Sequence, residues 1–202
     1  MFQSLAKKFG AKSPQVWINY AHFAYYTRQS PEQGRAVLAR SLQALDKAAG
    51  LFVTSRCAAM EFRSPKGFPE RGRTLFEGLL DMWPKRFDLW NQRLDLETAL
   101  FAAEKAKGKD GEADPGPVRD VLERGARVAG LKPRRAKVWF QRWAKWEEEN
   151  GDSKSRDRVS SKAREWAAEA EKRNRAVREG VGDTGRGLDQ EGTGFSGGGL
   201  AS

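Results

Sequence analysis

Apolar side chains recur along this chain at the three- and four-residue spacing of amphipathic helices, as far as about residue 178. Alternating runs of β-branched residues, which indicate strands, are nearly absent. Short breaks at Gly50, Ser64–Gly67, Trp83-Pro84 and Lys132-Pro133 separate most of the helices, so consecutive helices should form antiparallel hairpins. The pattern predicts about eight helices, near 15–28, 32–48, 51–63, 70–82, 87–104, 117–129, 136–149 and 154–178.

Two of the expected helix starts carry a serine followed by proline. Ser13-Pro14 and Ser30-Pro31 each place a capping residue before a proline suited to the first helical position. Gln33 follows Ser30 by three residues, which predicts a capping box.

A short unit recurs in alternate helices. It starts at Trp17, Thr54, Trp90 and Phe140, at successive offsets of 37, 36 and 50 residues. Its first, fourth, fifth and eighth positions share one helical face. The signature residues of this unit are Trp17, Tyr20, Glu61, Trp90, Glu97, Trp143 and Glu147.

The intervening helices also align with one another. The segments 34–42, 72–80 and 118–126 share apolar positions and a set of arginines. Two sub-patterns that recur in the same order indicate an array of helix-turn-helix repeats. The arginines of this second pattern are Arg35, Arg40, Arg73, Arg119 and Arg124.

The repeat unit resembles the half-a-TPR (HAT) repeat of RNA-processing proteins. The segments 16–23, 58–65, 69–77 and 83–91, with 137–147 as a last repeat, are similar to the C-terminal HAT region of the ribosomal RNA processing protein five (programmed cell death protein eleven) family. The resemblance covers about residues 1–178. It implies an all-α fold, a superhelical solenoid of HAT/TPR-like helix-turn-helix repeats.

The chain departs from the family pattern at several positions. Ala24 replaces the usual glutamate of the first repeat, and Thr54 and Cys57 replace the aromatic residues of the second. Gly78 replaces an arginine, and residues 99–116 are enlarged. Only the third repeat has both the signature glutamate, Glu97, and the signature arginine, Arg124. Glutamate–arginine pairing within a hairpin is therefore not expected to be uniform.

The repeats predict the following organisation. Residues 1–12 are interpreted as the end of a preceding HAT repeat, so the chain is expected to be a C-terminal piece of a longer protein or a shortened gene product. Residues 179–202 are rich in glycine and are expected to form a disordered tail. The array covers 13–178, with repeats at about 13–50, 51–84, 85–133 and 134–178.

Composition limits the chemistry. The single cysteine and single histidine cannot form a disulfide within the chain or a zinc site from soft ligands, whereas a metal site made of carboxylates alone stays open. No cofactor or metal is expected. Any nucleophilic device would have to use His22, which is expected to face solvent, whereas Cys57 is expected in the core. The chain is therefore expected not to be an enzyme, and no long apolar run predicts a membrane span.

Three further patterns have plain explanations. The recurring aromatic residues could stack on bases, but their helical spacing favours packing between helices. The acidic run 147–149 includes the repeat's own glutamate and is interpreted as a solvated face. The segment 180–185 matches G-x-G-x-x-G but lacks the preceding strand that a dinucleotide site needs.

A basic segment is the candidate for contact with RNA or another partner. It holds six cations in fourteen residues without an acid, in a chain of net charge +10. The alternative, a solvated surface, stays equally open. The candidate residues are Lys132, Arg134, Arg135, Lys137, Arg142 and Lys145.

The resemblance implies a non-catalytic scaffold in ribosome biogenesis, in the nucleolus or nucleus. Its expected partners are pre-ribosomal assembly proteins, with pre-rRNA or snoRNA-containing particles as further candidates, and neither a membrane nor a small-molecule substrate. The alternative is a HAT scaffold of pre-mRNA 3′-end cleavage or splicing. An RNA-modifying or nuclease enzyme would need a convergent polar pocket.

Overall fold

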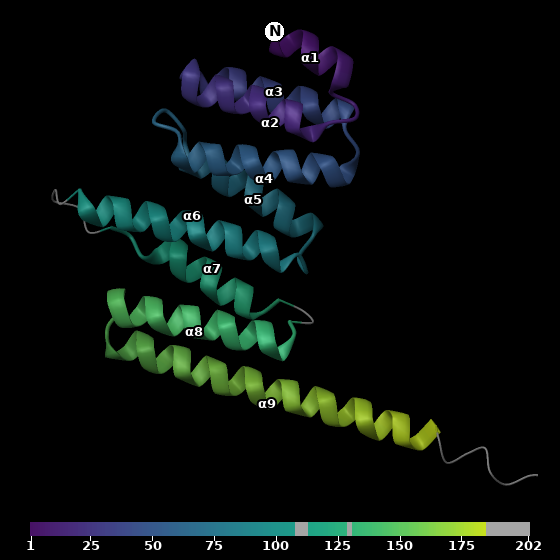
Figure 1. Ribbon diagram of the computed structural model, residues 1–202. Helices are drawn as coiled ribbons and strands as arrows, with labels where there is room; N and C mark the ends of the chain where they lie inside the picture. The colour runs from purple at the N-terminus through teal and green to yellow at the C-terminus, as the bar shows by residue number, and fades with distance from the viewer. Residues whose placement is uncertain (108–112, 129–130, 185–202) are drawn as a thin grey trace, which may run out of the picture. The chain divides into compact units, whose positions relative to one another are not determined.

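The computed structural model describes residues 1–107, 113–128 and 131–184, and every element in these ranges is a helix (Figure 1). The chain divides into two compact units, Met1–Trp139 and Phe140–Ser202. Within the described ranges, no helix combines the length and apolar character needed to cross a membrane. The same ranges hold no group of three or more His, Cys, Asp or Glu side chains placed to bind a metal ion.

The helix boundaries follow the predicted ones closely. The first unit holds α1 (Phe2–Phe9), α2 (Pro14–His22), the π-helical turn η1 (Phe23–Thr27), α3 (Pro31–Ala44), α4 (Lys47–Arg63), α5 (Pro69–Met82), α6 (Phe87–Ala106) and α7 (Gly116–Ala126). α8 (Pro133–Asn150) begins in the first unit and ends in the second, which continues with α9 (Ser153–Thr184). The prediction that the disordered tail starts at residue 179 was wrong, because α9 continues to Thr184. The rest of the expected tail, residues 185–202, and residues 108–112 of the enlarged loop lie outside the described residues.

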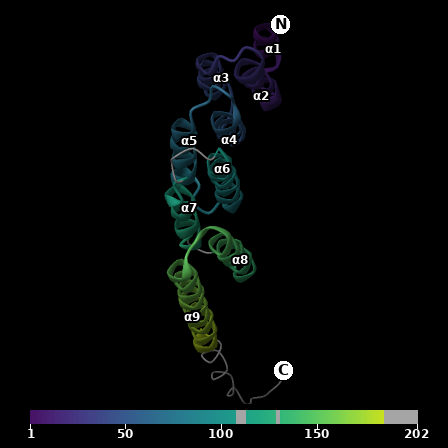
Figure 2. The same cartoon turned by 90° about the vertical axis from the view of Figure 1, so that its left-hand side faces the viewer.

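Consecutive helices of the first unit form hairpins, as predicted. α2 with η1 contacts α3, α4 contacts α5, and α6 contacts α7; these are called hairpins one, two and three. The first helices of neighbouring hairpins also touch, since α2 contacts α4 and α4 contacts α6 (Figures 1 and 2). Hairpins one and two therefore each pack against the next hairpin along the chain.

The signature aromatic residues serve this packing. Trp17 and Trp90 keep only 3% and 5% of their surface exposed. Each indole also donates a hydrogen bond to a backbone carbonyl of the preceding segment, at Gly10 and Pro84 respectively. Trp143 and Trp146 are buried as well. The packing interpretation of these tryptophans is confirmed.

The turn η1 widens the helix by one residue, and this changes which side chains face the interior. Tyr25 is 1% exposed, and its ring lies against the backbone of α3 at Gly34. A Cβ atom at position 34 would come within 2.2 Å of that ring, so glycine is required there.

Three local predictions were wrong. Neither Ser13 nor Ser30 makes a side-chain capping hydrogen bond, although Pro14 and Pro31 do occupy the first turns of α2 and α3. The helix that was expected to start after Gly50 instead starts at Lys47, because the Asp46 side chain caps it by accepting a hydrogen bond from the Ala49 amide at 2.8 Å.

Candidate partner-binding groove

The signature glutamate of hairpin two binds an arginine of hairpin one. Glu61 is 1% exposed and receives two hydrogen bonds from the Arg35 guanidinium, at 2.7 and 3.0 Å. The Tyr25 hydroxyl and the Phe68 amide complete its shell at 2.7 and 3.0 Å. Burial acts to raise the pKa of Glu61, but the hydrogen bonds from Arg35, Phe68 and Tyr25 outweigh it and hold that pKa below its usual value.

The next hairpin repeats the arrangement. Arg73 of α5 binds Glu97 of α6 through two hydrogen bonds of 2.8 Å. The two pairs that use a signature glutamate, Arg35–Glu61 and Arg73–Glu97, therefore join neighbouring hairpins. Glu97 and Arg124, which share hairpin three, do not form the pair considered from the sequence: each has its main partner on α5.

Arg124 instead binds Glu77 of α5, at 2.7 and 2.6 Å. Arg93 of α6, 4% exposed, also binds Glu77. Hydrogen bonds from Arg124, together with the nearby charge of Arg93, overcome partial burial and lower the pKa of Glu77 to about 2. This cluster was not foreseen: Arg93 is the fourth residue of the unit that starts at Trp90, and Glu77 lies in the segment 72–80, but neither is among the signature residues of the two patterns.

A second recurring contact joins the two helices of one hairpin. The Arg40 guanidinium lies over the Trp17 ring, with 5.8 Å between its Cζ atom and the ring centre. In hairpin three, Arg124 lies over Trp90 at 5.5 Å. Such cation–π contacts cover the outer face of the indole.

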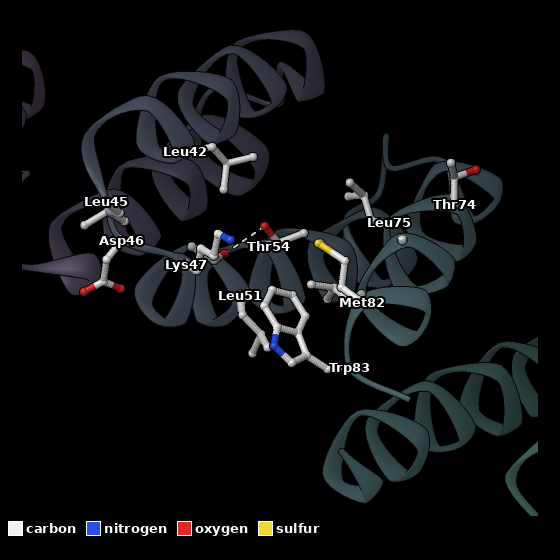
Figure 3. Close-up of a pocket in the computed structure, with 13 residues that line it drawn as sticks. Leu42, Leu45, Asp46, Lys47, Leu51, Thr54, Thr74, Leu75, Met82 and Trp83 are labelled. Atoms are coloured by element: carbon white, nitrogen blue, oxygen red, sulfur yellow. Dashed lines mark hydrogen bonds between the residues drawn. The ribbon is translucent and has the colours of Figure 1, made fainter. Parts of the chain in front are cut away.

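Hairpin two lacks both members of this pair, since Thr54 and Gly78 stand at the tryptophan and arginine positions. A cavity of about 570 Å³ opens at this point, between the end of α3 and the facing parts of α4 and α5 (Figure 3). No atom lies within 4 Å of where a Gly78 Cβ would be, so the space beside it is open. This apolar groove is lined by Leu42, Leu45, Asp46, Lys47, Gly50, Leu51, Thr54, Thr74, Leu75, Gly78, Leu79, Met82 and Trp83.

The groove offers mainly apolar surface and few polar groups that are free to bind a ligand. The hydroxyls of Thr54 and Thr74 already donate to the backbone carbonyls of Gly50 and Glu70, at 2.8 and 3.0 Å. Its two charged residues, Asp46 and Lys47, are adjacent and of opposite sign. The groove therefore selects for apolar side chains rather than for charge.

The rim of the groove is exposed. Leu42 and Met82 keep 49% and 64% of their surface open to solvent. The Trp83 ring lies beside Leu51 (Figure 3), and its indole N–H has no hydrogen-bond acceptor among the described residues. An apolar wall with one available donor is suited to a peptide, whose backbone supplies carbonyl oxygens.

The predicted basic segment maps to the start and length of α8. Lys132 precedes the helix, and the other five cations lie on it. At 100° per residue, Arg134, Lys137 and Lys145 fall opposite the side of the helix that buries Trp139 and Trp143, and the remaining two cations flank that side. All six are exposed except Arg142, which is half-buried.

The remaining predicted residues differ in burial. Tyr20 and Arg119 are half-buried, and Glu147 is 2% exposed. His22 is exposed and packs against the Tyr26 ring at 4.5 Å, as its solvent-facing pattern predicts. Cys57 is fully buried, and burial raises the pKa of its thiol to about 12, so it is a poor nucleophile.

Comparison with known proteins places the chain beside one group. It is 35% identical over 172 residues to the rRNA biogenesis protein rrp5 of Schizosaccharomyces pombe, a match that covers 85% of this chain and 9% of that protein. It is 30% identical over 167 residues to the rRNA biogenesis protein RRP5 of Arabidopsis thaliana, and 30% over 166 residues to the RRP5 homolog of Mus musculus. These two matches cover 83% and 82% of this chain and 8% of each relative. No protein-family profile matches the chain.

Proposed function

From the premise that this chain is homologous to a region of the RRP5 family over most of its length, we propose that it is a non-catalytic scaffold of rRNA biogenesis. It spans less than a tenth of the relatives that it matches, so their role is extended to this piece as part of the proposal. In this proposal the hairpins form a HAT solenoid that works in the nucleolus, on the small-subunit precursor. The names of the relatives support this role over the pre-mRNA alternative.

The scaffold binds a segment of another pre-ribosomal protein in the apolar groove. The observation that carries this proposal is the loss of the tryptophan–arginine pair at Thr54 and Gly78, where the cavity opens. The occupant presents apolar side chains to Leu42, Leu51 and Met82 and a backbone carbonyl to the Trp83 indole. The balanced charges of the lining disfavour a nucleic acid here.

Site-specific photo-crosslinking tests this proposal. A benzoylphenylalanine placed at Leu42 or Met82 in the whole chain should form a cross-link to one identified pre-ribosomal protein, at a segment with regularly spaced apolar residues. The same group at Phe68, which is 53% exposed and lies outside the groove, is the matched control.

Three outcomes would overturn the proposal. A cross-link to a second copy of this chain would make the groove a self-association surface. A cross-link to RNA, or displacement by a small apolar molecule with no protein cross-link, would assign the groove to another ligand.

A further inference from the structure

A second groove lies between α2–η1 and α4, on a different part of the first unit from the apolar groove. It encloses about 350 Å³, within the range of about 300–1,000 Å³ that holds small ligands or single groups of larger ones. Ile18 and Met60 form its buried floor. We call this second groove the basic-aromatic groove. Its walls include Gln15, His22, Tyr26, Phe52, Arg56 and Arg63.

The aromatic members present planar surface at the wall. Phe52 keeps 39% of its surface exposed, which is unusual for a large apolar ring beside an available core. The Arg56 guanidinium lies over this ring at 5.3 Å. Across the groove, the His22 and Tyr26 rings lie against each other at 4.5 Å. Planar groups on both sides can stack on an unpaired base.

The turn η1 contributes to this arrangement. Tyr25 and Tyr26 are adjacent, yet the first is buried against Glu61 and the second lines the groove. Burial raises the pKa of the Tyr26 hydroxyl, and the positive charge of Arg63 opposes that rise, which places Arg63 close to this ring. The Tyr26 hydroxyl therefore stays protonated and can donate a hydrogen bond at neutral pH.

The charged residues that line the groove are all positive. Its lining holds no carboxylate, and neither Arg56 nor Arg63 forms an ion pair with any described residue. The whole segment 1–31 lacks Asp and Glu, and so does 47–60. Glu61, the first acid of α4, is buried and bound by Arg35. Unneutralised guanidinium groups of this kind attract phosphates.

From this combination we infer that the basic-aromatic groove binds single-stranded RNA. One base enters between the His22–Tyr26 and Phe52 walls, and the flanking phosphates contact Arg56 and Arg63. The stacking and charge argue for an unpaired strand, and the preference for RNA over DNA rests on the proposed role in rRNA biogenesis. Base stacking distinguishes this site from the α8 cations, whose contact with RNA would depend on charge alone.

Binding of a fluorescein-labelled ten-nucleotide uridine RNA to the whole chain, measured by anisotropy, tests this inference. Removing the rings with Tyr26→Leu and Phe52→Leu should weaken binding about tenfold and leave its salt dependence unchanged. Replacing the cations with Arg56→Gln and Arg63→Gln should also weaken binding and reduce the slope of log affinity against log salt by roughly 1.4, since each single-strand phosphate contributes about 0.7.

Matched controls separate this site from others. Lys7→Gln with Lys8→Gln removes the same charge from exposed positions of α1 and should change affinity less than twofold. Thr54→Trp with Gly78→Arg fills the apolar groove and should leave RNA binding unchanged. RNA binding by the basic-aromatic groove can therefore be disproved without disproving the proposed scaffold role, and the reverse also holds. A 5-iodouridine RNA should cross-link to the α2–η1 or α4 peptide that carries Tyr26 or Phe52.

Several results would overturn the inference. Wild-type RNA affinity in the Tyr26→Leu, Phe52→Leu variant would show that the rings take no part. Equal competition by a ten-residue polyaspartate would make the groove a general polyanion or acidic-peptide site. Equal affinity for the matching DNA strand would remove the assignment to RNA.

Discussion

The guanidinium of Arg40 lies over the indole of Trp17, 5.8 Å from the ring centre, and closes the space between the two helices of hairpin one. Arg124 and Trp90 do the same in hairpin three. Hairpin two has Gly78 and Thr54 instead, and the apolar groove occupies the uncovered space. The groove therefore lies where both members of the recurring arginine–tryptophan pair are absent.

Two glycines of α5 should respond in opposite ways to substitution by alanine. At Gly78 a Cβ atom meets nothing within 4 Å, so Gly78→Ala should stabilise the chain by about 0.5–1 kcal/mol through helix propensity. At Gly72 a Cβ atom would lie 2.6 Å from the Phe62 ring, so Gly72→Ala should destabilise it by about 1–3 kcal/mol. Urea unfolding followed by circular dichroism measures both; equal effects would contradict the described packing.

Gly78→Arg extends this comparison to function. The arginine restores the usual residue of the repeat and places a long side chain in the apolar groove. Its expected result is an intact fold with loss of the cross-link from Met82. Retention of that cross-link in a folded Gly78→Arg variant would count against the groove as the binding site.

The helices and hairpins could be predicted because their determinants are local and recur. Apolar spacing predicted α2 to α9, and the two aligned patterns paired the helices of hairpins one, two and three correctly. The start of α4 was missed because the cap at Asp46 depends on where α3 ends, and Gly50 is accommodated inside the helix. The Ser30 capping box failed because the motif permits that hydrogen bond without requiring it.

The partners of the signature residues could not be read from sequence in the same way. Glu97 and Arg124 lie in one hairpin, but the bonds run to α5, to Arg73 and Glu77. The packing of one hairpin against the next determines which residues Glu97 and Arg124 bind, and no local sequence pattern encodes that packing. The departures at Thr54 and Gly78 were visible in the sequence, yet only the structure shows that they face one cavity.

Removing the charge of Glu61 should test the link between hairpins one and two. Glu61→Gln leaves the Arg35 guanidinium without its carboxylate in a part-buried site, and breaking such a pair should cost about 3 kcal/mol. The control is Glu32→Gln. The Glu32 side chain is 80% exposed and lies 3.9 Å from Arg35, which is long for an ion pair, so this substitution should lower the free energy of unfolding by less than about 0.5 kcal/mol. Urea midpoints at pH 7 compare them, and similar midpoints would refute the assigned role of Glu61.

Glu77 should make stability depend on acid pH. Its pKa falls from 4.5 to about 2 in the folded chain, chiefly through hydrogen bonds from Arg124. A lowered carboxyl pKa stabilises the fold above about 4.5, and this contribution is lost as pH falls from there towards 2. Unfolding free energy measured across that window should fall less steeply in Glu77→Gln than in the wild type. Parallel curves would mean that the cluster does not hold Glu77 ionised.

The cations of α8 provide the last prediction, since Arg134 and Arg135 are both exposed at the start of the helix. If they bind phosphates, Arg134→Gln with Arg135→Gln should lower RNA affinity and reduce the salt slope by roughly 0.7 for each single-strand phosphate that is no longer neutralised. These positions carry no exposed ring that would stack, so the difference from wild type should disappear at high salt, unlike that of Tyr26→Leu with Phe52→Leu. Anisotropy at several salt concentrations separates the two. An unchanged salt slope in the α8 variant would show that these cations do not bind phosphates. They would then form a solvated surface, the alternative that the sequence leaves open.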